Sequence, residues 1–182
     1  REEPDRPKYY GDDHLWIIQT VASYLKETGD VAFLDKEIPF YDKDKATGKA
    51  LETGTVWEHI CRSIRFTWNN RGAHGLPLLG FADWNDTVNL PTGAESMFNA
   101  NLFGKALVEA IEVADNAGKT AEAAEFRDYY AQMKKIVNDV AWDGKWWKRY
   151  FDEKGNPIGS NENTYGKLYT NGQSWPVISG FA

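Results

Sequence analysis

Apolar residues recur at helical spacing from the start of the chain. Over residues 14–28 they fall on one face of a predicted helix, at Leu15, Ile18, Ala22 and Leu25. Asp12 or Asp13 can cap the start of this helix, and Gly29 ends it. A shorter helix is predicted over residues 31–38, and it should end there because the next residue is a proline. These two helices should form a helical hairpin.

The next segment, residues 41–54, is polar and charged, with Lys and Asp alternating, so it should form an exposed loop. Thr55 and Glu58 then have the spacing of a capping box, in which each side chain accepts a hydrogen bond from a free backbone N–H at the helix start. The helix that follows is expected over about residues 56–69. Four side chains should face inward from it, Val56, Ile60, Ile64 and Trp68.

A second helical hairpin is predicted in the second half of the chain. A long helix should cover about residues 94–117 and stop at Gly118. Another should run from Thr120 to Val140, with apolar residues at helical spacing at Phe126, Tyr130, Met133 and Val137.

The pattern changes after residue 142. Aromatic residues crowd between two turn signals over residues 142–158, which favours a β-hairpin, and they are Trp146, Trp147, Tyr150 and Phe151. The last residues resemble the start of a helix, with Ser174 as its N-cap and Pro176 in its first turn. The chain is therefore expected to be one all-α domain over residues 1–182, made of antiparallel helical hairpins with a small β-hairpin insertion.

Composition narrows the range of partners. A net charge of −6 and a pI near 5.1 argue against nucleic acid or an anionic membrane surface as partner, because both require a basic patch. Aromatic residues make up 14% of the chain and include eight Trp, more than an ordinary core needs. More than half of these rings should pack between helices, and the rest suit the stacking of sugar rings.

Two further features concern chemistry and location. Cys61 is the single cysteine, so an intrachain disulfide and a Cys-based zinc site are both excluded. No run of apolar residues approaches the length of about 18 that spans a membrane. The chain begins with Arg1 instead of Met, which suggests a fragment. It has no recognisable signal peptide, but in a chain that has lost its natural start this absence says little about secretion. We expect a cytoplasmic protein.

The most informative segment is GFADWNDTVNLPTGAE, residues 80–95. Asp83 and Asp86 bracket Trp84 and an asparagine, with turn-forming residues on both sides. An apolar sugar face can stack on Trp, and an acid can protonate a glycosidic oxygen. Because Asp and Asn also favour turns for local reasons, the same tetrapeptide is compatible with a simple surface turn.

The surroundings of this segment resemble the cellobiose phosphorylase family of inverting glycoside phosphorylases. The resemblance is carried, in the same order and at compatible spacing, by YYGDDHLW, WEHICRSIRFTWNN, HGLPLLGFADWNDTVN, GNPIGS and NGQSWPVIS. It covers most of the chain, and it implies part of an (α/α)6 barrel whose loops gather at one end to form the active site.

The resemblance also implies roles for individual residues. The second acid of the DWND pattern, Asp86, corresponds to the proton donor, and we expect it to be held partly away from water beside a hydrophobic wall. Trp84 corresponds to the residue that lines the subsite of the transferred sugar. In the family, an aspartate of the DDHLW motif binds the hydroxyls of that sugar. This role is assigned to Asp13 first and to Asp12 second. Asp83 should order the loop. The family carries an arginine just before the acid pair. Arg6 is the candidate for this substrate-binding residue, but it lies farther from the acid pair here.

A late segment resembles one that approaches the acceptor sugar and phosphate. Lys167 could donate to an acceptor hydroxyl and Gln173 could orient a hydroxyl or phosphate oxygen, although both could equally be exposed polar side chains. The resemblance implies inorganic phosphate as a co-substrate, no further cofactor, and a full-length protein that can form a homodimer.

The expected reaction is inverting phosphorolysis of a β-linked glucosyl disaccharide or oligosaccharide. Phosphate attacks the anomeric carbon while Asp86 protonates the leaving sugar, so no second catalytic carboxylate is needed. An inverting hydrolase, a non-catalytic saccharide-binding module and a purely structural helical array are the alternatives. A metal site at Asp12, Asp13 and His14 is disfavoured, because the other histidines fall at no recognised ligand spacing.

Overall fold

The computed structural model describes residues 9–182, and about 50% of the chain is helical. Five α-helices form the body: α1 (Asp13–Thr28), α2 (Val56–Asn69), α3 (Met97–Asn116), α4 (Thr120–Ile136) and α5 (Thr170–Ser179). The shorter elements are a 3-10 helix η1 (Val31–Asp35), a π-helical turn η2 (Val137–Ala141) and the strands β1 (Glu37–Pro39), β2 (Thr53–Thr55), β3 (Glu95–Ser96), β4 (Tyr150–Phe151) and β5 (Pro157–Ile158).

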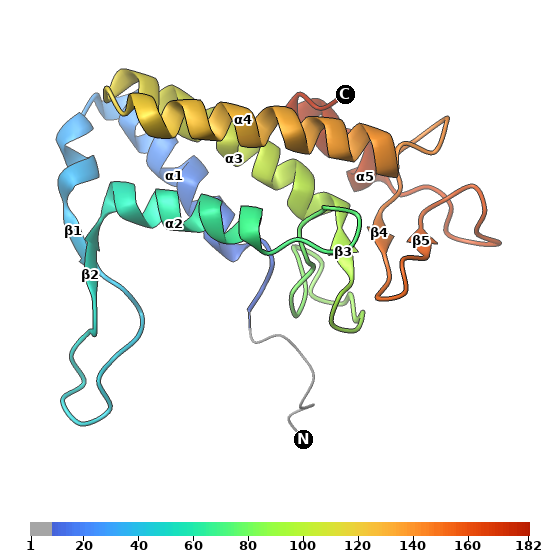
Figure 1. Cartoon of the computed structure of the whole chain (residues 1–182), viewed down its shortest axis with the longest axis horizontal. Coiled ribbons are helices and arrows are strands. Elements are labelled where there is room, and N and C mark those ends of the chain that lie inside the picture. The colour runs from blue at the N-terminus through green and yellow to red at the C-terminus, as the bar shows by residue number, and fades with distance from the viewer. Residues whose placement is uncertain (1–8) are drawn as a thin grey trace.

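Helix α3 is the centre of the fold. It packs against α1, α2, α4 and α5, and its buried residues lie on all its sides. Figure 1 shows α2 and α4 in front of α1 and α3, so that the helices form two layers. At Gly104 the terminal Phe181 comes so close that a Cβ would lie 2.3 Å from the ring. A helical glycine is retained here because only its missing side chain admits the ring.

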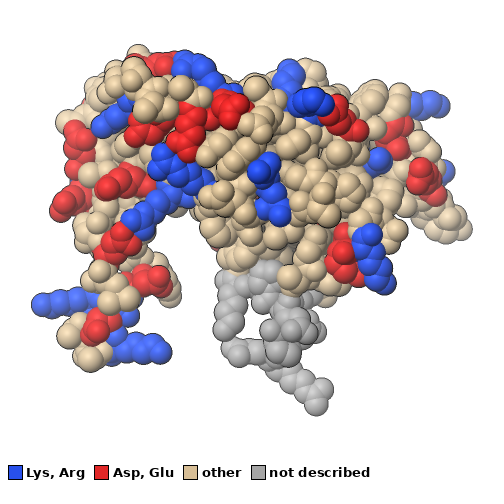
Figure 2. All heavy atoms as spheres, viewed as in Figure 1, with Lys and Arg blue, Asp and Glu red and all other residues tan. Residues whose placement is uncertain are grey.

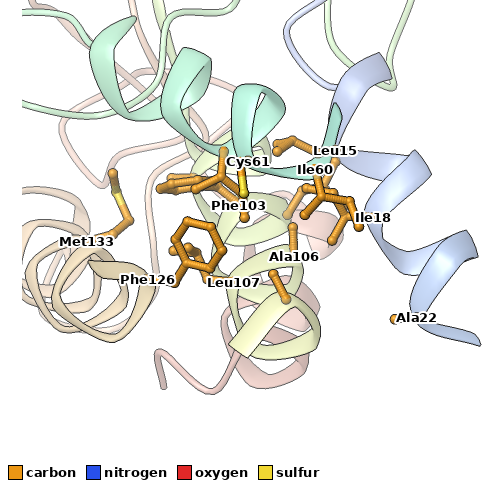
Figure 3. Packing of buried hydrophobic residues seen from close by; sticks show 14 of the residues in the cluster. Leu15, Ile18, Ala22, Ile60, Cys61, Phe103, Ala106, Leu107, Phe126 and Met133 are labelled. Carbon is orange, nitrogen blue, oxygen red and sulfur yellow. The ribbon is translucent and has the colours of Figure 1, made fainter. Parts of the chain in front are cut away.

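One hydrophobic core fills the space between these layers. Figure 3 shows its centre, where α1, α2, α3 and α4 contribute Leu15, Ile18, Ile60, Cys61, Phe103, Ala106, Leu107, Phe126 and Met133. The inward faces predicted for the helices are confirmed, with three adjustments. Leu25, Trp68 and Tyr130 are only half-buried. Trp68 stacks on Tyr129 of α4 with a ring separation of 4.2 Å.

Several helix boundaries follow local chemistry that the sequence already contains. Thr55 Oγ1 accepts a hydrogen bond from Glu58 N, and Glu58 Oε2 accepts one from Thr55 N, which confirms the capping box. Gly29 has a left-handed backbone with φ of 68°, and its N–H donates to the carbonyl of Leu25. The first helix therefore ends where it was expected to end.

The helix predicted over residues 31–38 is wrong in its second half. The 3-10 helix stops at Asp35, and residues 37–39 form strand β1, which pairs antiparallel with β2. This pairing satisfies backbone groups of a short segment that would gain only one further helical turn. The intervening loop is exposed, as predicted, and projects as a ribbon below β1 and β2 in Figure 1.

The last helix begins earlier than its predicted N-cap. Helix α5 starts at Thr170, and Ser174 lies inside it, where its hydroxyl donates to the carbonyl of Thr170 one turn before. Pro176 is therefore in the interior of the helix and not in its first turn. The error arose because Ser favours an N-cap and a bond to the preceding turn by the same local mechanism.

The β-hairpin predicted after residue 142 is confirmed, and a third strand joins it. Strand β4 pairs antiparallel with β5 on one side and with β3 on the other. Since β3 directly precedes α3, the hairpin is tied to the start of the central helix.

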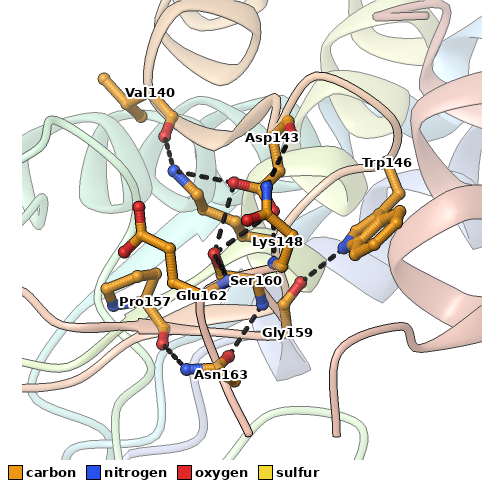
Figure 4. A network of polar contacts seen from close by, with 10 residues as sticks. Val140, Asp143, Trp146, Lys148, Pro157, Gly159, Ser160, Glu162 and Asn163 are labelled. Carbon is orange, nitrogen blue, oxygen red and sulfur yellow. Dashed lines mark hydrogen bonds and ion pairs between the residues drawn. The ribbon is translucent and has the colours of Figure 1, made fainter.

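Polar contacts order the rest of this region, as Figure 4 shows. Asp143 accepts hydrogen bonds from Asn161 N at 2.5 Å and from the Ser160 hydroxyl at 3.2 Å, and Trp146 Nε1 donates to Gly159 O at 2.9 Å.

The outer surface carries charges of both signs. Figure 2 shows Lys and Arg interspersed with Asp and Glu over the face formed by α2 and α4. Arg65 of α2, for example, pairs with Glu125 of α4 at 2.7 Å. Within residues 9–182, no helix is both long and apolar enough to cross a lipid bilayer.

Candidate active site

Two motifs far apart in the sequence lie side by side at one end of the helices. The N–H of Gly11 donates to the carbonyl of Ala82 at 2.9 Å, and the N–H of Phe81 donates to the carbonyl of Tyr9 at 2.7 Å. The segment that leads into α1 therefore runs antiparallel to the segment that precedes DWND. This end also receives the loops that follow α2 and α4 (Figure 1).

Glycines make this close approach possible. A Cβ on Gly11 would lie 2.1 Å from Asn99 Nδ2 and 2.5 Å from the carbonyl oxygen of Leu79. Gly80 has φ of 73°, and a Cβ there would lie 2.6 Å from the carbonyl oxygen of Tyr9. Both positions exclude any side chain, because backbone atoms stand in the way.

Of the paired acids, Asp12 is the one inside this site. It is 4% exposed, and the indole Nε1 of Trp16 donates to its Oδ2 at 2.8 Å. Burial raises the pKa of Asp12 and the nearby charges of Asp13 and Asp83 raise it further, whereas the hydrogen bond from Trp16 acts in the opposite direction. Its side chain makes no helix-capping hydrogen bond.

Asp13 is exposed at the first position of α1. It was expected before Asp12 as a sugar ligand, and that role stays a prediction for both residues. The carboxylate of Asp12, in contrast, is buried and oriented by the indole of Trp16.

Aromatic side chains from three helices and the loop gather next to Asp12. The ring of Phe98 lies 6.1 Å from that of Trp84, 6.2 Å from Trp16 and 5.0 Å from Trp175. Trp84 is 61% exposed and so presents much of its indole to a ligand. An exposed indole of this kind can stack on the apolar face of a sugar ring.

Sequence reasoning missed Trp16 and Phe98 in this cluster. Neither was singled out, because more than half of the aromatic residues were expected to pack between helices. The position of Trp16 four residues after Asp12 was the available signal, since side chains four apart on a helix meet.

Asp83 orders the loop, as predicted. It is 1% exposed, and it accepts hydrogen bonds from Ser96 Oγ at 2.7 Å, Tyr150 OH at 3.2 Å and Asn85 N at 3.0 Å. A buried carboxylate needs several donors of this kind to offset the loss of water. The loop between Asp83 and Glu95, residues 84–94, is called the acid-bearing loop below.

Asp86 lies on the exposed part of this loop. The sequence analysis expected it beside a hydrophobic wall and partly shielded from water, and that expectation is wrong for this chain. The physical reason is that the buried anchors of the loop are its two ends, Asp83 and Glu95, whereas the turn between them projects into solvent. Whether Asp86 donates a proton stays a prediction.

The late segment is placed differently from the acid pair. Lys167 is exposed and donates to the carbonyl of Asn161 at 2.9 Å. The amide of Gln173 is bound to the backbone of Trp147, with Oε1 accepting from its N–H at 3.0 Å and Nε2 donating to its carbonyl at 2.8 Å. The two Gln173 bonds fasten α5 to the hairpin, and the sugar or phosphate contacts of Lys167 and Gln173 stay predictions.

Arg6 lies outside the described residues. Among residues 9–182, no group of three or more His, Cys, Asp or Glu side chains is arranged to hold a metal ion.

Comparison with known proteins agrees with the resemblance seen in the motifs. The family model described as Glycosyl hydrolase 94 superfamily, catalytic domain, matches residues 5–182. The chain is 36% identical to a solabiose phosphorylase of Paenibacillus borealis over 98% of its own length and 23% of that protein's length. It is 32% identical to an N,N'-diacetylchitobiose phosphorylase of Vibrio proteolyticus, covering 94% of this chain and 20% of that protein. With a cellobionic acid phosphorylase of Neurospora crassa the identity is 29%, over 93% and 21%.

Proposed function

Because the chain belongs to the Glycosyl hydrolase 94 superfamily through its catalytic domain, we propose that it forms part of the (α/α)6 barrel of an inverting glycoside phosphorylase. The chain spans less than a quarter of the length of the relatives compared above, the largest share being 23%. The proposed activity is therefore that of a longer protein of which these residues would be a part.

The observation that carries the proposal is the direct backbone pairing of the two motifs. It brings the buried carboxylate of Asp12 and the exposed indole of Trp84 to the same end of the barrel segment as Asp86. A site that holds a sugar ring needs an aromatic face and a hydroxyl acceptor, and a site that cleaves its bond needs an acid.

The proposed reaction balances with one protein acid. An oxygen of inorganic phosphate attacks the anomeric carbon of a β-linked glucosyl unit, and the bond from that carbon to the bridging oxygen breaks. Asp86 gives its proton to that oxygen, which leaves as a hydroxyl of the shortened sugar. Inversion yields an α-glucosyl 1-phosphate. A hydrolase would need a further base to activate water, which phosphate makes unnecessary.

The exposure of Asp86 sets a condition on this proposal. A general acid works best when water is displaced from it. The proposal therefore assigns the cover over Asp86 to the bound saccharide and to the remainder of a longer enzyme. Asp12 and Trp84 would hold the transferred sugar beneath that cover.

The test is phosphorolysis by the full-length protein. Incubation with cellobiose or laminaribiose should release α-glucose 1-phosphate only when phosphate is present. The Asp86→Asn variant should lose at least about a hundredfold in kcat, the usual contribution of a general acid. Equal cleavage without phosphate would establish the hydrolase, and an unchanged rate for the variant would remove Asp86 from its role.

One observation favours a second candidate, a non-catalytic saccharide-binding module. The exposed Trp84 is suited to stacking on a sugar, whereas Asp86 is exposed to water and so lacks the shielding that favours a general acid. Calorimetry with the same disaccharides distinguishes the two. A binding module would hold sugar equally in the wild-type protein and in Asp86→Asn, and neither would turn it over.

A further inference from the structure

We propose that Tyr150 is a positioning residue for the general acid. It acts through Asp83 to hold the acid-bearing loop against the sheet of β3, β4 and β5. This inference rests on the proposed function, because it assigns to Tyr150 the task of orienting Asp86. The hydroxyl of Tyr150 reaches Asp83, and its effect on Asp86 would be transmitted through the loop.

The first step is the contact between Tyr150 and Asp83. The Tyr150 hydroxyl donates to Asp83 Oδ1 at 3.2 Å, and both residues are buried, at 3% and 1% exposure. The same Oδ1 accepts from the N–H of Asn85 at 3.0 Å. Tyr150 and the backbone just before Asp86 thus converge on one carboxylate oxygen.

Hydrogen bonds of Asn85 also span Asp86. Asn85 Oδ1 accepts from the N–H of Thr87 at 3.3 Å and from its hydroxyl at 2.7 Å. The carbonyl of Asn85 accepts from the N–H of Val88 at 2.9 Å. Asp86 is therefore bracketed, since the residue before it binds Asp83 and also holds the two residues after it.

The third step is the rigidity of the anchor. Tyr150 belongs to β4, where it pairs with Ser96 on one side and with Ile158 on the other. The ring packs with Leu79 and Ala94 in a small hydrophobic cluster of its own. Ser96 completes the anchor, because its hydroxyl donates to Asp83 Oδ2 and accepts from Asn99 N, which caps α3.

The other end of the loop is held in a similar way. Glu95 is 1% exposed, and its Oε1 accepts from the N–H of His74 at 3.0 Å and of Leu76 at 3.1 Å. Its neighbour on β4 is Phe151, on which the His74 ring stacks at 4.1 Å. Strand β4 therefore supports both ends of the loop, and Tyr150 supports the end nearer to Asp86.

The chemical state of Tyr150 suits this role. Burial raises its pKa above the ordinary tyrosine value, and the charge of Asp83 adds to that effect. Tyr150 consequently keeps its proton and acts as a donor over the whole range of pH in which a phosphorylase would work.

Tyr150→Phe tests the inference, because it removes only the hydroxyl. The readout is the dependence of rate on the leaving group, measured with the full-length protein and phosphate. A disaccharide needs a proton on its leaving oxygen, whereas 2,4-dinitrophenyl β-glucoside releases a stable phenolate without one. We expect kcat for the disaccharide to fall about tenfold, part of the contribution of a general acid, and kcat for the aryl glucoside to change less than about twofold.

Two reference variants separate the possible outcomes. Tyr130→Phe is the matched control, because it removes a tyrosine hydroxyl that donates to the carbonyl of Ser179 at 2.9 Å, away from the loop. It should leave both rates unchanged. Asp86→Asn should show the same preference for the aryl glucoside as Tyr150→Phe, but more strongly.

The inference is overturned if Tyr150→Phe lowers both rates equally or neither. If Asp86→Asn also lacks the preference, the proposed acid fails as well, so the two failures are distinguishable. Hydrogen exchange of the amides at residues 85–88 gives a readout that needs no turnover. Exchange should speed up in Tyr150→Phe and not in Tyr130→Phe, and equal protection in both would refute the positioning role.

Discussion

Replacing Gly11 by alanine should separate the two motifs that form the candidate active site. The new Cβ would lie 2.1 Å from Asn99 Nδ2, 2.5 Å from Leu79 O and 3.0 Å from Leu78 O. The asparagine side chain can move, but the two carbonyl oxygens belong to the backbone of the facing segment. The clash is therefore either borne as strain or relieved when the segment that carries Gly11 lifts away.

The magnitude follows from what is lost in either outcome. A forced fit costs about 1–3 kcal/mol, as for other overpacked sites. Lifting the segment instead breaks the two backbone hydrogen bonds at Tyr9 and Gly11, at about 1 kcal/mol each. Because the protein takes the cheaper of these alternatives and does not suffer both, we expect the free energy of unfolding to fall by about 2 kcal/mol.

Urea unfolding followed by tryptophan fluorescence measures this loss, and phosphorolysis by the full-length protein measures its effect on the site. We expect kcat/KM to fall far more than the loss of folded protein explains, because Asp12 moves with the segment. Gly118→Ala is the matched control, since Gly118 has φ of 69° with nothing within 4 Å of a Cβ. Its cost should be about 1 kcal/mol from backbone strain, with unchanged kinetics. Wild-type stability and activity in Gly11→Ala would refute the reasoning.

Two further predictions concern stability. Burial lowers the pKa of His14 from 6.5 to about 4, so its contribution to stability is complete above pH 6.5 and is lost as the pH falls toward 4. This amounts to at most about 3 kcal/mol, and thermal melts from pH 7 to 4 should be less pH-dependent in His14→Gln; equal slopes for the two proteins would contradict it. In Gly104→Ala the new Cβ meets the Phe181 ring at 2.3 Å. We expect a loss of about 1–3 kcal/mol in urea unfolding that a second change, Phe181→Leu, partly restores, whereas additive losses would argue against a direct clash.

The helical pairs were accessible from the sequence for identifiable reasons. Apolar spacing marked the faces of α1, α2 and α4, and the capping box at Thr55 and Glu58 set one boundary to the residue. Where local chemistry was ambiguous, the predictions failed. Ser174 could cap a helix or bond to a preceding turn, and only the packing of α5 on α3 decided between them.

The residue types of the site were also predictable, but their roles were less so. DWND and DDHLW could be recognised as motifs, and the loop-ordering role of Asp83 followed from its type and setting. Which of Asp12 and Asp13 is buried could not be predicted, because adjacent residues at a helix start point in different directions. Trp16 and Phe98 were missed for a related reason, since the spacing of a helical aromatic does not say whether its partner is another helix or a ligand.

Local interactions along the chain thus specify where helices form, where they end and which side chains can do chemistry, because these depend on neighbours a few residues away. The pairing of Gly11 with Ala82, the burial of Asp12 and the hydroxyl that Tyr150 extends to Asp83 join residues that are distant in sequence. Such contacts depend on how the layers pack around α3, and packing is settled by shape and by the absence of side chains at particular glycines. Only the tertiary structure therefore decided that these motifs lie side by side, and that Asp86 stands exposed on a loop anchored at both ends.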